Sequence, residues 1–233
     1  MAFVRGRTLA NGIGLWSAVF LLLSTVAAIV TVVPARSGPF CLADCIGYPY
    51  ADIARFYPAD YRWMIGSLLG SVALVPLAAA ALDATESGRR VLGVLGVAFA
   101  TLTATVLSIC YLTQLHVVQP SVLAGESDGI AILTQYNDHG LFIALESLGY
   151  LALSVTLALI GLALPVPGRA GTAVRWTASL YAVAVIGAFV VIEVALGVTR
   201  SYYFEVISIS ANWVGLLALG VVACLTFRRL RRT

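Results

Sequence analysis

The twenty residues WMIGSLLGSVALVPLAAAAL, at positions 63–82, decide the fold of this chain. They lie between Arg62 and Asp83 and contain no charged side chain. A helix needs about 20 mostly apolar residues to cross the hydrocarbon core of a bilayer. The stretch has this length and composition, and it therefore predicts a transmembrane helix.

Five further apolar stretches of this kind occur in the 233 residues. The third is expected to end before Pro120, because proline interrupts a helix. The connecting segments are too short for a soluble domain of ordinary size. We therefore predict an all-α fold with one transmembrane domain over residues 1–233, a six-helix bundle with spans at about 10–33, 63–82, 91–118, 140–164, 174–198 and 204–227.

The composition excludes other classes of protein. Apolar residues make up 61% of the chain and charged residues 11%, whereas soluble domains have about 45–50% and about 25%. A soluble globular protein, a disordered chain and a nucleic-acid binder are excluded. All 14 basic residues are arginines, which with the abundance of Ala, Val, Gly and Leu indicates a GC-rich bacterial genome. We expect a multi-pass protein of the bacterial plasma membrane, in contact with the lipid bilayer and without a nucleic-acid partner. The sequence predicts no particular protein partner.

The arginines also predict the orientation of the chain. With the N-terminus inside, ten of the fourteen lie in cytoplasmic segments, and the positive-inside rule favours this arrangement. Both termini are then cytoplasmic. A cleaved signal peptide is the alternative for the first stretch, but its apolar run is about twice the usual length. The longer loops, at about 34–62 and 119–139, lie outside, and loop length places function on that side.

The first outer loop contains Cys41 and Cys45. The outer compartment permits a disulfide between them. The alternative is a redox or metal pair, although no adjacent His-Cys pair completes a metal site. Downstream, aromatic and charged residues alternate from Asp52 to Trp63, which is typical of an amphipathic segment at the membrane interface. A lid over a pocket is the other interpretation of this segment.

Polar residues inside the predicted spans are the best indication of function, because an ionisable group at the bilayer centre costs about 2.5–3.5 kcal/mol on insertion scales. On four spans such residues fall in the outer half of the bilayer. At helical spacing, His139, Glu146 and Tyr150 share one face. We expect an outward-opening polar pocket lined by Gln114, His116, Glu146, Tyr150, Glu193 and Asn212, with His139, Arg200 and Glu205 at its rim.

Three functions are compatible with this pocket. The leading hypothesis is that the protein binds or moves a small molecule, lipid or ion, with Glu146 or Glu193 as a proton carrier if transport is proton-coupled. The second is a structural or accessory protein whose polar residues only hold the bundle together, for example Glu193 with Arg200. An intramembrane enzyme is the third, although the sequence lacks the HExxH, GxSxG and P-loop motifs. We therefore predict no catalytic residue, no metal and no cofactor.

Three segments resemble a group of small bacterial six-span integral membrane proteins. They are Gln135–Tyr150, Cys41–Cys45 with the following Ile-Gly-Tyr-Pro-Tyr, and Tyr203–Trp213. The resemblance covers nearly the whole chain and implies a six-span topology. The group has no assigned activity, so the resemblance implies no mechanism.

Overall fold

The computed structural model describes the backbone of residues 2–232 and the side chains of residues 9–50 and 52–232. The side chains of Arg5 and Arg7, which support the predicted orientation, lie outside this part. Every regular element of the described backbone is a helix. The long helices are α1 Ala2–Thr31, α2 Arg62–Ala84, α3 Arg90–Thr113, α6 Leu141–Ala163, α7 Gly168–Leu196 and α8 Tyr203–Leu230.

The structure confirms the predicted all-helical chain with six helices long and apolar enough to cross a membrane. These candidate spans are Leu9–Thr31, Ala59–Ala84, Ser87–Leu123, Leu141–Ala163, Gly168–Thr199 and Tyr203–Leu230. The shorter helices and helical turns are η1 Gly38–Phe40, η2 Ala51–Phe56, η3 Ala59–Tyr61, η4 Ser87–Arg89, η5 Gln114–Val118, α4 Gln119–Leu123, α5 Ile130–Leu133 and η6 Gly197–Thr199.

The prediction that the third span ends before Pro120 is wrong. Helix α3 continues through a π-helical turn, η5, directly into α4, which ends at Leu123. Pro120 lies in the first turn of α4, directly after this π-helical turn. The second long loop therefore begins at residue 124 rather than 119.

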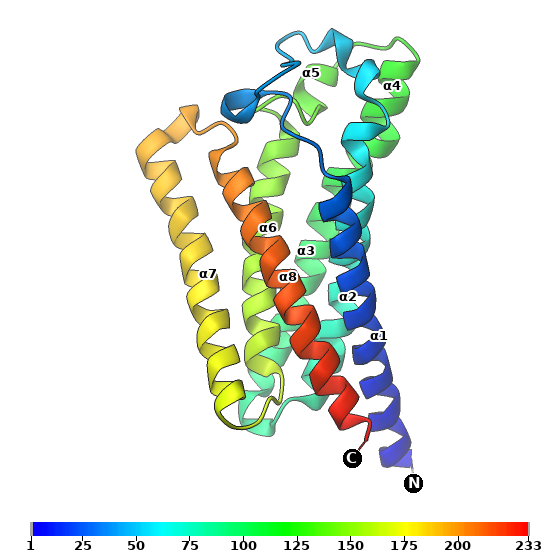
Figure 1. Cartoon of the computed structure of the whole chain (residues 1–233), viewed down its shortest axis with the longest axis vertical. Helices are drawn as coiled ribbons and strands as arrows, with labels where there is room; N and C mark the ends of the chain where they lie inside the picture. Colours follow the sequence, from blue (N-terminus) through cyan, green and yellow to red (C-terminus); the bar gives the residue numbers. More distant parts are fainter. Residues whose placement is uncertain (1, 233) are drawn as a thin grey trace.

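The helices form a bundle with two different ends (Figure 1). Helix α1 begins and α8 ends at the same end, called here the terminal end, whereas α4, α5 and the long loops lie at the opposite loop end. Helix α1 packs on α2 and α8, and α3 packs on α2 and α6. The α1–α2 contact is close, because a Cβ added at Gly66 would lie 2.6 Å from the backbone nitrogen of Ala28.

Helix α7 is the least embedded of the six. In its most apolar window only 6% of residues are buried, against 67% for α6. Figure 1 shows α7 and α8 close together at the loop end and diverging toward the terminal end. The rings of Phe189 and Phe204 hold the upper ends together, with centroids 4.9 Å apart. The axes of the two helices therefore move apart toward the terminal end.

Candidate functional site

A polar pocket of about 130 Å³ lies at the loop end of the bundle. Three segments that are distant in sequence build it: the chain that leaves α1, the turn η3 that precedes α2, and the loop between α5 and α6. The lining residues are Val32, Val33, Pro34, Ala35, Arg36, Ser37, Asp60, Trp63, Gln135 and Tyr136. We call this space the outer pocket.

The carboxylate of Asp60 is the central polar group of the outer pocket. The residue is only 2% exposed. Its Oδ2 accepts a 3.0 Å hydrogen bond from the Tyr136 hydroxyl and lies 3.4 Å from Nε of Arg36. Its Oδ1 is buried and has no hydrogen-bond donor among the described residues. A buried acceptor without a donor costs about 1–3 kcal/mol, so Asp60, which lines the pocket, holds an unsatisfied oxygen that is buried in this conformation.

Arg36 places a positive charge beside this carboxylate. Its guanidinium also forms a 3.5 Å ion pair with the exposed Asp44 and lies 4.6 Å above the centroid of the Phe56 ring. Burial raises the pKa of the Tyr136 hydroxyl, which therefore remains protonated and keeps donating to Asp60. The outer pocket thus combines an acceptor, a cation and hydroxyl and amide groups within one small space.

The loop before α6 is fastened by side chains from η5 and from the turn before α8. Gln114, predicted as a pocket residue, donates from Nε2 to the Leu133 carbonyl at 2.6 Å and accepts from the Gln135 amide at 3.0 Å. The Tyr202 hydroxyl lies 2.8 Å from the Ser37 hydroxyl and donates to the Gln135 carbonyl at 2.9 Å. These bonds fix the position of Gln135, and with it one wall of the outer pocket.

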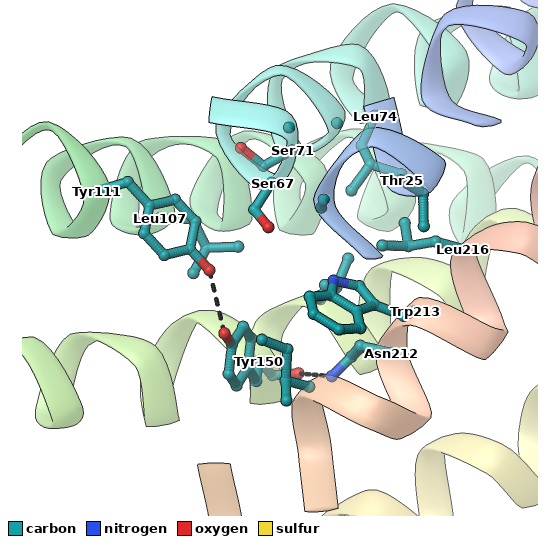
Figure 2. Close-up of a pocket in the computed structure, with 15 residues that line it drawn as sticks. Thr25, Ser67, Ser71, Leu74, Leu107, Tyr111, Tyr150, Asn212, Trp213 and Leu216 are labelled. Atoms are coloured by element: carbon teal, nitrogen blue, oxygen red, sulfur yellow. Dashed lines mark hydrogen bonds between the residues drawn. The ribbon is translucent and has the colours of Figure 1, made fainter. Parts of the chain in front are cut away.

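A smaller cavity of about 20 Å³ lies deeper in the bundle, between α1, α2, α3, α6 and α8. This is space for about one water molecule. Figure 2 shows the hydroxyls of Tyr111 and Tyr150 pointing toward one another, 3.1 Å apart. The Ser67 hydroxyl also lines the cavity and has no hydrogen-bond partner among the described residues. We call this space the inner cavity.

Glu146 lies directly behind the two tyrosines. It is buried, and its Oε1 accepts hydrogen bonds from Tyr150 at 2.6 Å and Tyr111 at 3.5 Å. Within residues 9–50 and 52–232, no arginine forms an ion pair with it. Hydroxyl donors, rather than a cation, therefore hold this carboxyl group.

Asn212 connects the inner cavity to α7. Its Oδ1 accepts from the Tyr181 hydroxyl at 2.8 Å and from Ser154 at 3.3 Å, and its Nδ2 donates to the Ser208 carbonyl. Figure 2 shows its second, longer bond to the backbone of Tyr150. Asn212 is therefore internally satisfied, although it lines the cavity.

Trp63 separates the two spaces. It lines the outer pocket, and its ring centroid lies 5.5 Å from that of Tyr111 and 6.4 Å from that of Trp213. Tyr111 and Trp213 both line the inner cavity. Trp63, in the wall of the outer pocket, thus packs on two rings that line the inner cavity, and we call these three rings the aromatic layer.

A second polar cluster joins α7 to α8 at the loop end. Arg200 forms 2.9 Å ion pairs with both Glu193 and Glu205, and it donates to Ser147 on α6. Glu205 is 4% exposed, whereas Glu193 is 36% exposed. None of the described cavities is lined by these charged residues.

Among the other predicted site residues, the two histidines lie apart from both spaces. His116 is exposed, because the buried stripe of α3 continues through Tyr111 to Gln114 and Val118 at helical spacing and leaves His116 on the opposite face. His139 precedes α6, which begins at Leu141, so the prediction that it shares a helical face with Glu146 is wrong. It is exposed and pairs with Asp138 at 2.9 Å.

Sequence reasoning missed Arg36, Asp60 and Tyr136 as pocket residues. Arg36 is one of the fourteen arginines that predict the orientation, and Asp60 falls in the stretch from Asp52 to Trp63, which is predicted to be an amphipathic segment at the membrane interface. The available signal was the run Asp60-Tyr-Arg-Trp63, which puts a carboxylate at the very start of an apolar span. Such a group needs a partner, but the sequence does not show which one.

The cysteine pair lies in the loop between α1 and α2. The Cα atoms of Cys41 and Cys45 are 5.8 Å apart, a separation typical of disulfides. Among the described residues, no group of three or more His, Cys, Asp or Glu side chains is arranged to hold a metal ion. The pair is thus a local feature of the loop, away from the outer pocket lining.

Comparison of the chain with models of known protein families, with curated proteins and with solved structures finds no match. The two polar spaces and their chemistry are therefore the features of this protein that bear on its function.

Proposed function

We propose that this is a multi-pass protein of the bacterial plasma membrane whose outer pocket binds a small solute that carries an amine. The loop end faces outward and both termini are cytoplasmic, as the distribution of arginines favours. One observation carries the proposal: the buried Asp60 carboxylate lines an open pocket and has an oxygen without a donor. An ammonium group in the pocket supplies the missing donor when the carboxylate turns its buried oxygen toward the solute, and its charge complements that of the carboxylate.

The other groups of the pocket restrict the solute further. Arg36 carries five N–H donors and favours a carboxylate or another acceptor on the same solute. The pocket volume of about 130 Å³ corresponds to about four water molecules at about 30 Å³ each. A short zwitterion or a small amino alcohol fits this space and this arrangement of charges.

The inner cavity supports a second step, in which the solute or a proton moves inward. It lies below Trp63 and adjoins Glu146, the one buried carboxyl group of the described bundle core that is held only by hydroxyl donors. Passage between the two spaces requires the aromatic layer to open. Binding in the outer pocket is therefore the step that the observed geometry supports directly.

A structural or accessory role is the second candidate function. The cluster around Arg200 favours it, because this guanidinium joins α7 to α8 and α6 without lining a described cavity. On this alternative, the residues of the outer pocket would only hold the loops to the bundle, and no solute would bind there.

The test measures the thermal stability of the purified protein in detergent with four probes: glycine, ethanolamine, acetate and ethylene glycol. A ligand that binds only the folded state stabilises it, with a shift that grows with concentration. We expect glycine or ethanolamine to raise the melting temperature and the other two probes to leave it unchanged. Asp60→Asn should abolish the shift, since an amide cannot carry the charge but can still accept from Tyr136.

Asp44→Asn is the matched control, because Asp44 also pairs with Arg36 but is exposed and lies outside the pocket lining. It should keep the shift. The proposal is rejected in favour of the structural role if no amine stabilises the wild-type protein, or if Asp60→Asn responds as the wild type does.

A further inference from the structure

A long apolar groove of about 700 Å³ runs between α6, α7 and α8. Small side chains form much of its wall, including Gly161, Ala178 and Gly215. Three hydroxyl residues line it, Thr177, Tyr181 and Ser210. The Tyr181 hydroxyl donates to Asn212, and the Ser210 hydroxyl donates to the Val206 carbonyl of its own helix. An occupant of this mostly apolar groove needs no hydrogen-bonding groups, so an alkyl chain suits it.

The length of the groove matches one leaflet of a bilayer. On α8 it runs from Ser210 to Val222, which at 1.5 Å per residue is about 18 Å. Half of a hydrocarbon core is about 15 Å. Toward the loop end the groove is closed, where Phe189 packs on Phe204 and Arg200 pairs with Glu193. A transmembrane helix of a partner protein spans both leaflets, so this groove would cover only about half of such a helix.

A second cleft of about 320 Å³ lies farther along α8, toward the terminal end. Its wall on α8 begins at Leu225, one helical turn beyond Val222. It is lined by Pro165, Val166, Pro167, Leu225, Thr226, Arg229 and Leu230. The side chain of Arg229 is exposed and forms no ion pair with a described acidic residue. The cleft thus places the Thr226 residue, and an exposed guanidinium that forms no ion pair with a described acidic residue, beyond the terminal end of the apolar groove.

We propose that an anionic phospholipid binds here, with an acyl chain in the groove and its phosphate at Arg229. Charge complementarity at the terminal end supports this proposal, together with a groove that is one leaflet deep. Arginine binds phosphate oxygens through paired N–H donors. The site lies at the opposite end from the outer pocket, and the proposal does not depend on solute binding there.

The experiment is native mass spectrometry of the protein released from nanodiscs of equal parts phosphatidylglycerol and phosphatidylcholine. Wild-type protein should retain phosphatidylglycerol preferentially. Arg229→Gln should lower that retention about tenfold, since one charge-assisted contact is lost. Ala218→Phe, which fills the groove from its exposed wall, should lower the retention of both lipids.

Arg228→Gln is the matched control, because it removes the same charge from the neighbouring exposed residue outside the cleft lining. It should retain lipid as the wild type does. Equal losses for Arg228→Gln and Arg229→Gln would mean general attraction to a basic surface and would overturn the site. Unchanged lipid retention in both Arg229→Gln and Ala218→Phe would also overturn the site. A dimer in the wild-type spectrum that Ala218→Phe abolishes would overturn it too, because a second copy of the chain would then occupy the groove.

Discussion

The Tyr136 hydroxyl donates a 3.0 Å hydrogen bond to Oδ2 of Asp60, a residue 76 positions earlier in the chain. The bond joins the loop before α6 to the turn before α2, and both residues line the outer pocket. It satisfies one oxygen of a buried carboxylate and leaves the other without a donor. This single contact therefore holds two walls of the pocket together and fixes the Asp60 carboxylate with one oxygen unsatisfied.

Replacing Tyr136 by Phe should destabilise the protein by about 1–3 kcal/mol, because the buried Asp60 carboxylate loses its hydroxyl donor. The melting temperature in detergent measures the loss. Tyr48→Phe is the control, since this tyrosine is largely exposed. Equal stability of the two variants would show that the Tyr136 bond contributes nothing to the folded state.

Replacing Arg200 by Gln should be far more damaging than replacing Glu193 by Gln. Loss of Arg200 leaves Glu205 buried without a cation, and breaking a buried pair costs about 3–5 kcal/mol. Loss of Glu193 leaves Arg200 paired with Glu205, and a partly exposed ion pair contributes about 0–1 kcal/mol. The melting temperatures of the two single variants and of the double variant give the interaction energy between Arg200 and Glu193. A loss for Glu193→Gln as large as that for Arg200→Gln would contradict this assignment.

Replacing Glu146 by Gln should change the melting temperature little, because the amide oxygen still accepts from Tyr150. Solute binding in the outer pocket should persist, since Trp63 lies between the two spaces. If the protein moves the solute, uptake of labelled glycine or ethanolamine into proteoliposomes should disappear in this variant. Uptake at the wild-type rate would exclude Glu146 from transport.

The orientation predicts which end of the bundle reacts with a membrane-impermeant maleimide in intact cells. In a background without the four native cysteines, Ser127→Cys at the loop end should be labelled directly. Ser87→Cys, in the connection between α2 and α3 at the terminal end, should be labelled only after permeabilisation. The reverse pattern would invert the topology and contradict the cytoplasmic termini.

The cysteine pair is expected to be oxidised in protein purified without reductant. Alkylation followed by mass spectrometry should find no free thiol at Cys41 or Cys45 until the protein is reduced. The double serine variant should melt close to the wild type, because the bond closes a short loop and constrains the unfolded chain little. Two alkylated thiols before reduction would show that the close pair is not bonded.

Some features of this protein are local properties of the sequence, and these could be predicted. The apolar run at 63–82 must form a spanning helix wherever its neighbours lie, because backbone groups inside a bilayer have to be paired within the segment. The proximity of Cys41 and Cys45 follows in the same way from their spacing. The predicted helix ends are less accurate. The third helix continues past Pro120 through a π-helical turn, and no pattern of residues in the sequence predicts such a turn.

The sequence by itself therefore determined six apolar helices and a group of polar residues in the loop-end half of the bundle. Only the tertiary structure decided which of these polar residues meet. Tyr111 lies beside Glu146 because α3 packs on α6, whereas His116 lies on the face of its helix that points away from the bundle. Asp60 meets Tyr136 because two loops converge over the bundle. The rotation of each helix and the path of each loop depend on packing between distant segments, and a pattern of neighbouring residues does not contain that information.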